Sequence, residues 1–315
     1  MPSQRQDASS RKSLGITPIA RRNFLRAAAG STLALSSATA LHAGTLALKD
    51  DSKASWSMQL ACSSIAFASL PIEQAVAKIA GLGFDAIDIW SAHAGCPHLD
   101  DVLDRLGPSG LKDLLEQHEL DLYSFSVYSG GYERYAELLG ACGGGVAVRG
   151  SSGPVPPEEL TTRMRQFLEG LKPLAELAEA NDSYIAIENH GNALLDSVDS
   201  FKAFADLNTN ERLGIALAPY HVQRLDESVI DAIRACGEHL SFIYMWQHEP
   251  ATAQLPGIGP ADMKPWLEAL SEIGYDYPIT PFMHQEPEPE AMELALEQAK
   301  TYLDDCYELL FPEVS

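Results

Sequence analysis

The feature that most constrains the fold of this chain is an eightfold alternation of short apolar runs with longer amphipathic segments. The apolar runs occupy residues 58–68, 84–90, 120–128, 145–152, 183–191, 212–221, 240–249 and 277–286. Each run precedes a segment with the period of a helix, the longest being 157–180 and 288–310. Parallel strands joined by crossover helices give this order, and strands covered on both faces read as continuous apolar runs. The alternation therefore predicts an α/β fold with eight parallel strands.

Eight strand–helix units within residues 57–312 match a (β/α)8 TIM barrel in number and length. A doubly wound open sheet is the alternative, but no GxGxxG turn follows the first apolar run, where a dinucleotide-binding fold would place one. The glycine-rich segment 140–150 leads into a strand instead of opening a helix, and we interpret it as a flexible approach loop. No linker interrupts residues 57–312, so we expect a single barrel domain.

The N-terminal segment has the layout of an export signal. Arg21 and Arg22 precede a weakly apolar run that ends in small residues, with candidate cleavage sites after Ala40 and Ala43. The paired arginines resemble the signal of the Tat route, which exports folded proteins. We therefore expect residues 1–43 to be a Tat-type signal peptide, residues 44–56 a flexible lead-in, and the mature protein to be periplasmic. A disordered basic tail is the alternative interpretation.

The charge of the chain limits its partners. Its 44 acidic and 22 basic residues give a formal net charge of −22, and a surface of that sign repels phosphate backbones and anionic membranes. We therefore expect no nucleic-acid partner. Apart from the signal, no stretch approaches the roughly 18 apolar residues of a membrane span, so we expect no stable membrane insertion after cleavage. The sequence does not specify an oligomeric state.

Polar and aromatic residues gather where the predicted strands end. Active sites of TIM barrels lie at the C-terminal ends of the strands, so these positions form one ring. Histidines and carboxylates that meet at one cavity can hold a divalent metal. A structural role is the alternative for two of them, because Glu188 could pair with Arg149 and Pro219 could hold His221 as a core histidine. The candidate residues are Trp90, Arg149, Glu188, His190, His221, Trp246, Gln247, His248 and His284.

Four phrases of the sequence resemble one family. GFDAIDIW (83–90), IAIENHG (185–191), LPGIGPADMKPWLEAL (255–270) and YPITPFMHQEPEPE (277–290) are similar to the sugar phosphate isomerase/epimerase family, whose members have a xylose-isomerase-like TIM barrel. In that family a Glu that ends the fifth strand binds a metal ion, and Glu188 matches it. The resemblance therefore implies a divalent metal ion and a small-molecule carbohydrate substrate.

The chain departs from the family's metal ligands at two strands. The sixth strand of the family ends Asp-x-x-His, whereas this chain has Ala218 in place of the Asp and keeps His221. The eighth strand of the family offers a Glu, whereas this chain has Phe282 nearby and only His284 or Glu286 as substitutes. The ligand set implied by the resemblance is Glu188, His221, His248 and His284. Its many nitrogen donors would shift the preferred metal from Mg or Mn toward Zn, Co, Ni or Fe.

The resemblance also implies a reaction. A metal-assisted proton abstraction next to the carbonyl of a non-phosphorylated or keto sugar would give isomerisation or epimerisation, or elimination if the enzyme is a lyase. The alternative is a non-catalytic carbohydrate-binding barrel with a degenerate metal site, which Ala218 and Phe282 favour. The expected catalytic residues are Glu188, His221 and His284, and the expected substrate contacts are Trp90, Arg149, His190, Trp246 and Gln247.

Overall fold

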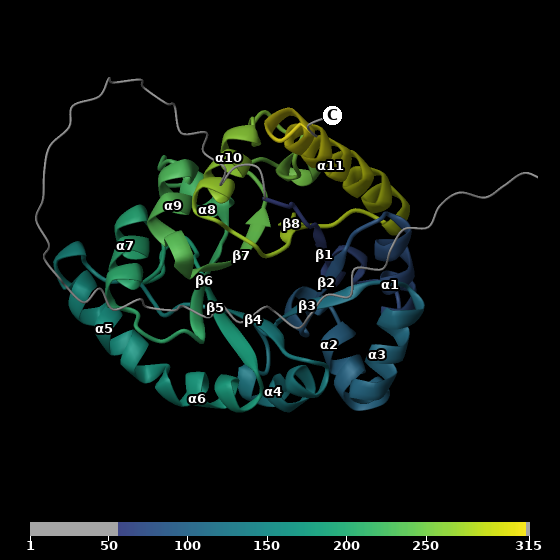
Figure 1. Cartoon of the computed structure of the whole chain (residues 1–315), viewed down its shortest axis with the longest axis horizontal. Coiled ribbons are helices and arrows are strands. Elements are labelled where there is room, and N and C mark those ends of the chain that lie inside the picture. The colour runs from purple at the N-terminus through teal and green to yellow at the C-terminus, as the bar shows by residue number, and fades with distance from the viewer. Residues whose placement is uncertain (1–55, 313–315) are drawn as a thin grey trace, which may run out of the picture. The chain divides into compact units, whose positions relative to one another are not determined.

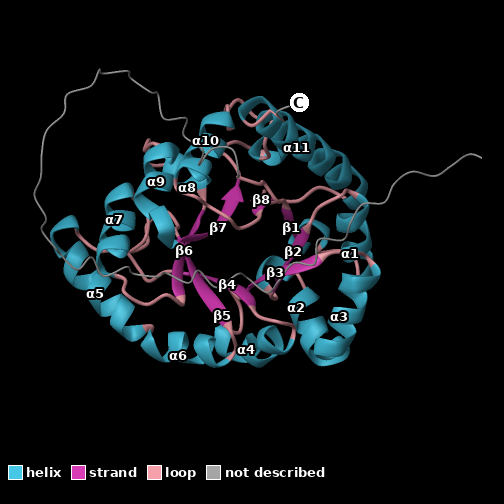
Figure 2. Ribbon diagram, viewed as in Figure 1, coloured by secondary structure: helices cyan, strands magenta, loops and turns pink. Residues whose placement is uncertain are grey.

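The computed structural model describes residues 56–312, which form a ring of parallel strands surrounded by helices (Figures 1 and 2). The strands pair in sequence order, and a bridge between Leu60 and Ile279 joins the last strand to the first. The predicted (β/α)8 barrel is confirmed. The predicted signal peptide lies outside the described residues. The strands are β1 (Ala61–Ser63), β2 (Ala86–Trp90), β3 (Asp121–Ser126), β4 (Gly145–Gly150), β5 (Ser183–Glu188), β6 (Leu213–Leu217), β7 (Leu240–Met245) and β8 (Ile279–Pro281).

Helices follow the strands and cover the outside of the barrel (Figure 2). Within residues 56–312, no helix combines the length and the apolar character that crossing a membrane requires. The α-helices are α1 (Ile72–Gly81), α2 (His98–Asp101), α3 (Gly107–Gln117), α4 (Tyr132–Ala141), α5 (Leu160–Gly170), α6 (Lys172–Ala180), α7 (Val198–Leu207), α8 (Pro219–Gln223), α9 (Val229–Cys236), α10 (Lys264–Glu272) and α11 (Pro289–Leu310).

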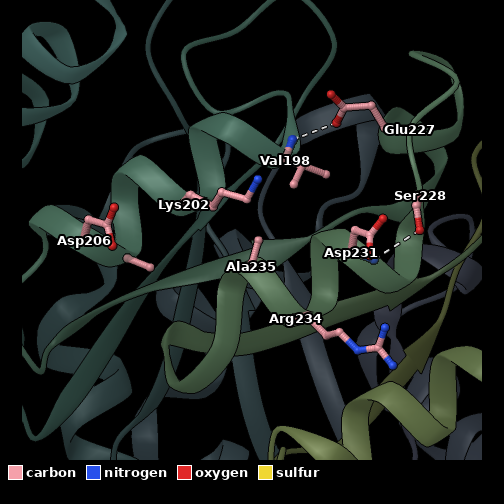
Figure 3. A pocket seen from close by; sticks show the side chains of 9 residues that line it. Val198, Lys202, Asp206, Glu227, Ser228, Asp231, Arg234 and Ala235 are labelled. Atoms are coloured by element: carbon pink, nitrogen blue, oxygen red, sulfur yellow. Dashed lines mark hydrogen bonds between the residues drawn. The ribbon is translucent and has the colours of Figure 1, made fainter.

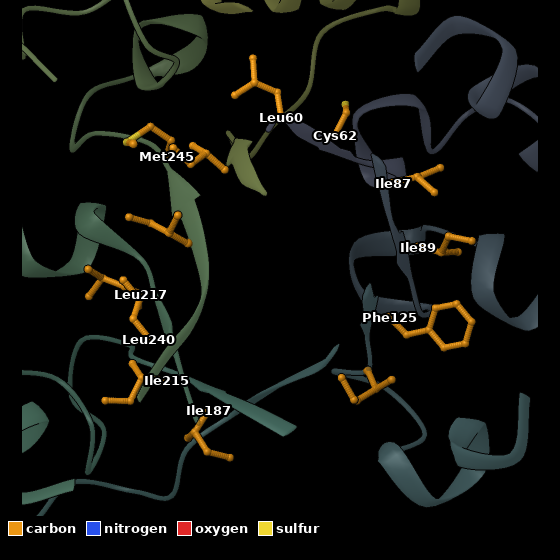
Figure 4. Packing of buried hydrophobic residues seen from close by; sticks show 14 of the residues in the cluster. Leu60, Cys62, Ile87, Ile89, Phe125, Ile187, Ile215, Leu217, Leu240 and Met245 are labelled. Carbon is orange, nitrogen blue, oxygen red and sulfur yellow. The ribbon is translucent and has the colours of Figure 1, made fainter. Parts of the chain in front are cut away.

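Two apolar clusters divide the interior according to the alternation of side chains along each strand. In one cluster, residues such as Ile87, Ile187 and Leu217 point outward to the helices (Figure 4). In the other cluster, their neighbours point into the barrel, among them Ala86 and Ala186. Because successive residues of a strand face opposite sides, the position of one strand residue determines the side of all the others. The same alternation decides which polar residues enter the barrel.

Prolines set two boundaries that differ from the sequence-based expectation. The helix expected over 157–180 divides at Leu171 into α5 and α6, and Pro173 stands in the first turn of α6. The strand expected over 212–221 ends at Leu217, and Pro219 opens the short helix α8. Proline is favoured in the first turn of a helix because the backbone N–H groups there have no intrahelical partner. His221 therefore lies in α8, beyond the end of β6.

The interpretation of the glycine-rich segment as a flexible loop is wrong. Gly143, Gly144 and Gly145 have φ values of 111°, 86° and 144° and make a tight turn into β4. A Cβ atom at Gly144 would lie 2.2 Å from the carbonyl oxygen of Asp182, which leaves no room for a side chain. Glycine is required here by a positive φ and by close backbone packing.

We expect Gly144→Ala to lower the free energy of unfolding by about 2–4 kcal/mol, because it combines a positive φ with a clash against backbone. Gly170→Ala is the matched control, since a Cβ at Gly170 has no atom within 4 Å and alanine favours the helix. Urea unfolding of both variants measures the difference. Equal stability of the two variants would contradict the tight turn.

Candidate active site at the barrel mouth

The C-terminal ends of the strands surround Glu188, the last residue of β5. Ala186 belongs to the inner cluster and Ile187 to the outer one, so the alternation directs Glu188 into the barrel. The side chain of Tyr128 interacts with its carboxyl group. Burial, together with the negative charge of Asp88, raises the pKa of Glu188 to about 7, although the Tyr128 contact opposes this rise. We call this end of the barrel the mouth; it includes Trp90, Tyr128, Glu188, Ala218, Trp246 and Phe282.

A second carboxylate, which sequence analysis missed, lies deeper in the barrel. Asp88 of β2 is fully buried and accepts hydrogen bonds from Ser63 Oγ at 2.8 Å, Ser124 Oγ at 2.9 Å, Ser126 Oγ at 2.9 Å and Trp90 Nε1 at 2.6 Å. Burial raises the pKa of Asp88 to about 6, while these hydrogen bonds hold it lower than burial alone would. One signal was present in the sequence, because residue 88 shares the inward side of β2 with Ala86 and Trp90.

Four of the candidate histidines gather around the mouth. His221 is 5% exposed, and its ring centroid lies 4.1 Å from that of His190. Burial lowers the pKa of His221 to about 3, and nearby His190, Arg224, His284 and His248 lower it further. Burial, with His93 and His190, lowers the pKa of His284 to about 4. Both His221 and His284 are therefore neutral near pH 7.

Aromatic rings form much of the mouth. Trp90 stacks on Phe282 with ring centroids 5.4 Å apart, and Trp246 stacks on Tyr220 at 4.2 Å. Tyr220 thus covers one face of Trp246. Two buried polar atoms here, Trp246 Nε1 and His221 Nδ1, have no hydrogen-bond partner within residues 56–312. A ligand oxygen would satisfy such atoms, since buried polar groups are normally hydrogen-bonded.

Two residues that were predicted to contact substrate, Arg149 and Gln247, are directed away from the mouth or bonded to the protein backbone. Arg149 follows the inward residue Val148 on β4, so the alternation directs it toward the helices and away from Glu188. Gln247 is buried, donates to the Leu255 carbonyl at 3.2 Å and accepts from the Ala261 N–H at 2.8 Å. Gln247 therefore braces the loop that follows β7. Their roles in substrate binding stay predictions.

Asn189, which follows Glu188 in the phrase IAIENHG (185–191), has a structural role. Its fully buried amide accepts a hydrogen bond from the Ala218 N–H at 2.6 Å and donates to the Ala218 carbonyl at 3.2 Å. These two bonds join the end of β5 to the end of β6. Asn189 therefore fixes the backbone beside Glu188.

The residues of the mouth do not fit the expected metal ion. Members of this family commonly depend on a metal, but no three His, Cys, Asp or Glu side chains within residues 56–312 are placed to share one. Ala218 presents a methyl group to the barrel interior, and the Phe282 ring packs on Trp90. The only neighbouring carboxylate that the described residues 56–312 place in an ion-pair contact with one of the expected ligands Glu188, His221, His248 and His284 is Glu286, whose Oε1 lies 3.9 Å from His284 Nδ1.

A groove on the outer ring does not offer an alternative site. It lies between α7 and α9 and encloses about 740 Å³ (Figure 3). Lys202 pairs with Asp199, Arg234 with Glu272, and Glu227 accepts from the Val198 N–H. Three of its charged side chains, those of Lys202, Arg234 and Glu227, therefore already have partners nearby.

Comparison with known proteins agrees with the barrel fold. Residues 76–305 match the xylose isomerase-like TIM barrel family, and the chain belongs to it. No curated protein sequence matches the chain significantly.

Several solved structures share the fold. The 3-keto-D-glucoside 4-epimerase from E. coli is 15% identical, with a TM-score of 0.60, over 78% of this chain and 100% of that one. The D-allulose 3-epimerase from Methylomonas sp. is 17% identical, with a TM-score of 0.61, over 79% and 98%. The probable 3-DHS dehydratase AsbF from Bacillus anthracis is 12% identical, with a TM-score of 0.62, over 76% and 98%. At these identities the likeness concerns the fold.

The lowered pKa of His221 predicts a loss of stability in acid. Below pH 6.5 the unfolded chain binds a proton at this residue while the folded chain does not, so stability falls as the pH drops toward 3. The slope from one such group is at most about 1.4 kcal/mol per pH unit. We expect His221→Gln to flatten the pH dependence of urea unfolding between about pH 6 and pH 4.

His118→Gln is the control, because His118 lies at the end of α3, away from the mouth. If His221→Gln and His118→Gln showed the same pH dependence as the wild type, the buried neutral state of His221 would be refuted.

Proposed function

We propose that the protein is an enzyme that moves a proton at a carbon atom next to the carbonyl group of an uncharged sugar. The observation that carries this proposal is the carboxyl group of Glu188, which enters the mouth with a pKa of about 7. A general acid or base works best when its pKa lies near the working pH, because both protonation states are then available. Such a carboxyl can remove a proton from carbon and return it.

Neutral donors of the mouth could hold the carbonyl oxygen of the substrate. Trp246 Nε1 carries a hydrogen, and the neutral imidazole of His221 offers one N–H, at either nitrogen. Donors aimed at the oxygen stabilise the negative charge that develops when the neighbouring C–H bond breaks. We assign the proton transfer to Glu188 and the support of the oxygen to Trp246 and His221.

The character of the mouth favours a sugar without a phosphate group. Its walls are aromatic, His221 and His284 are neutral near pH 7, and Arg149 is directed toward the helices. The names of two relatives with this fold describe epimerases of a keto-glucoside and of D-allulose. A free ketose or a keto-glycoside is therefore our first choice of substrate. An exported, periplasmic protein would also meet such sugars, and both that location and the Tat signal stay predictions.

A non-catalytic carbohydrate-binding barrel is the second candidate. Ala218 and Phe282 occupy inward positions where the resemblance to the family implies carboxylates. A barrel that has lost these groups could retain a sugar-binding mouth without turnover. The two candidates differ in one observable, the exchange of a carbon-bound hydrogen with solvent.

We expect the wild-type protein to exchange a carbon-bound hydrogen of a ketohexose or a keto-glucoside for deuterium in D₂O, and Glu188→Gln to slow this exchange by about 10²–10⁴-fold. Glutamine keeps the shape of the side chain but cannot take up the proton. Proton NMR of the sugar follows the exchange directly.

Asp121→Asn is the matched control, since Asp121 begins β3 at the opposite end of the barrel. Exchange that continues unchanged in Glu188→Gln would remove Glu188 from the mechanism. Binding of the sugars by the wild type without any exchange would select the carbohydrate-binding candidate.

A further inference from the structure

Two polar atoms in the loop after β8 face each other without a hydrogen bond between them. His284 Nδ1 lies 3.9 Å from Glu286 Oε1, beyond the range of about 2.7–3.2 Å for an N–H···O hydrogen bond. Within residues 56–312, Glu286 Oε1 is buried and has no hydrogen-bond partner. A buried acceptor without a donor is destabilising, and buried polar groups normally have partners. Glu286 Oε1 is therefore suited to accept a hydrogen bond from a bound molecule.

The backbone of this loop is held in place. The buried side-chain amide of Gln254 accepts a hydrogen bond from the His284 N–H at 3.1 Å and donates to the His284 carbonyl at 3.3 Å. Gln285, which follows, has a φ of 63°, in the left-handed region that residues other than glycine seldom adopt. Such a conformation persists where the surrounding structure holds it. The loop thus keeps His284 and Glu286 side by side on a fixed backbone.

The pair lies beside the donors that we assign to the carbonyl oxygen of the substrate. The rings of His284 and Trp246 are nearly perpendicular, with centroids 5.3 Å apart, and those of Trp246 and His221 are 5.5 Å apart. The side chain of His284 is 42% exposed, so a molecule that enters the mouth can reach it. A sugar held by Trp246 and His221 therefore has neighbouring groups within reach of His284 and Glu286.

The chemistry of the pair selects the group that it can bind. The neutral imidazole of His284 has one N–H group, and a carboxylate only accepts hydrogen bonds. Two hydrogen bonds of about 2.8 Å that meet at one oxygen atom can span the 3.9 Å between the two side chains. Among the groups of a sugar, only a hydroxyl group can accept from Nδ1–H and also donate to Oε1. A carbonyl oxygen or a ring oxygen has no hydrogen to donate.

We propose that a hydroxyl group of the substrate binds between His284 Nδ1 and Glu286 Oε1. Glu286 is then a specificity-determining residue, and His284 carries its hydrogen at Nδ1. The assignment rests on the proposed function, because it places the hydroxyl group on the sugar whose carbonyl oxygen Trp246 and His221 hold. The substrate must offer both a carbonyl group and a hydroxyl group, as ketoses and keto-glycosides do.

Binding of D-allulose and of its monodeoxy derivatives, each with one hydroxyl group replaced by hydrogen, tests this site independently of turnover. Isothermal titration calorimetry compares the wild type with Glu286→Ala. We expect one derivative to bind the wild type about 10–100-fold more weakly than D-allulose, the loss of one hydrogen bond to a charged group. D-allulose should bind Glu286→Ala more weakly by a similar factor. That derivative and D-allulose should bind this variant equally, because their hydroxyl groups no longer differ in partners.

Glu288→Ala is the matched control and should leave the affinity of every sugar unchanged. Glu288 carries the same charge two residues further along, but it is exposed and its side chain makes no capping hydrogen bond to α11. If every derivative bound the wild type as well as D-allulose does, or if D-allulose did not bind, the proposal would be overturned, whether or not the variants fold. A folded Glu286→Ala protein with wild-type affinity for D-allulose would overturn it as well.

Hydrogen exchange separates this proposal from the proposed function. Exchange on the sugar by a protein whose sugar binding does not depend on Glu286 would refute the hydroxyl site alone. Sugar binding that depends on Glu286, in a protein that shows no hydrogen exchange, would refute the proposed function alone.

Discussion

Closure of the parallel sheet into a barrel directs every second side chain of each strand inward, and the chemistry of the mouth depends on this constraint. On β5 it places Ile187 among the helices and Glu188 inside. Asp88 is fully buried, so it must find hydrogen bonds or keep its proton, whereas Glu188 is half-buried at the mouth. Asp88 accepts hydrogen bonds from four donors, whereas Glu188 interacts with the side chain of Tyr128. This difference in surroundings gives the two carboxyl groups different pKa values.

The same constraint explains what could be predicted from the sequence. Apolar runs that alternate with helical periods predicted eight strand–helix units. A strand that is covered on both faces needs apolar residues along its whole length, so it is recognisable as a continuous apolar run. Glu188 was found because it ends such a run. Asp88 was missed because it stands within a run, where a single acid is hidden by its apolar neighbours until the side that it faces is known.

Other features could not be predicted because they depend on contacts between distant segments. The bonds from Asn189 to Ala218 join the ends of different strands. The hydroxyl groups of Ser126, Tyr244 and Tyr128, which contact one another beside Asp88, come from β3, β7 and the segment after β3. The tight turn at Gly144 became clear only from the approach of the Asp182 carbonyl. Local patterns determine which elements form, whereas packing between strands determines which polar groups meet.

The chain has the barrel of its family, with apolar side chains at two inward positions of the mouth. A methyl group at Ala218 and an aromatic ring at Phe282 take inward positions, and buried neutral donors at Trp246 and His221 remain for a ligand oxygen. Neutral donors beside aromatic rings suit an uncharged, oxygen-rich molecule that offers an apolar face to those rings.

The most direct test of this account is deuterium incorporation into a keto sugar by chelator-treated protein, with and without added divalent metal. If Glu188 moves the proton and neutral donors hold the carbonyl oxygen, as we propose, we expect the same rate of incorporation in both samples. Incorporation that appears only after metal is added would contradict it.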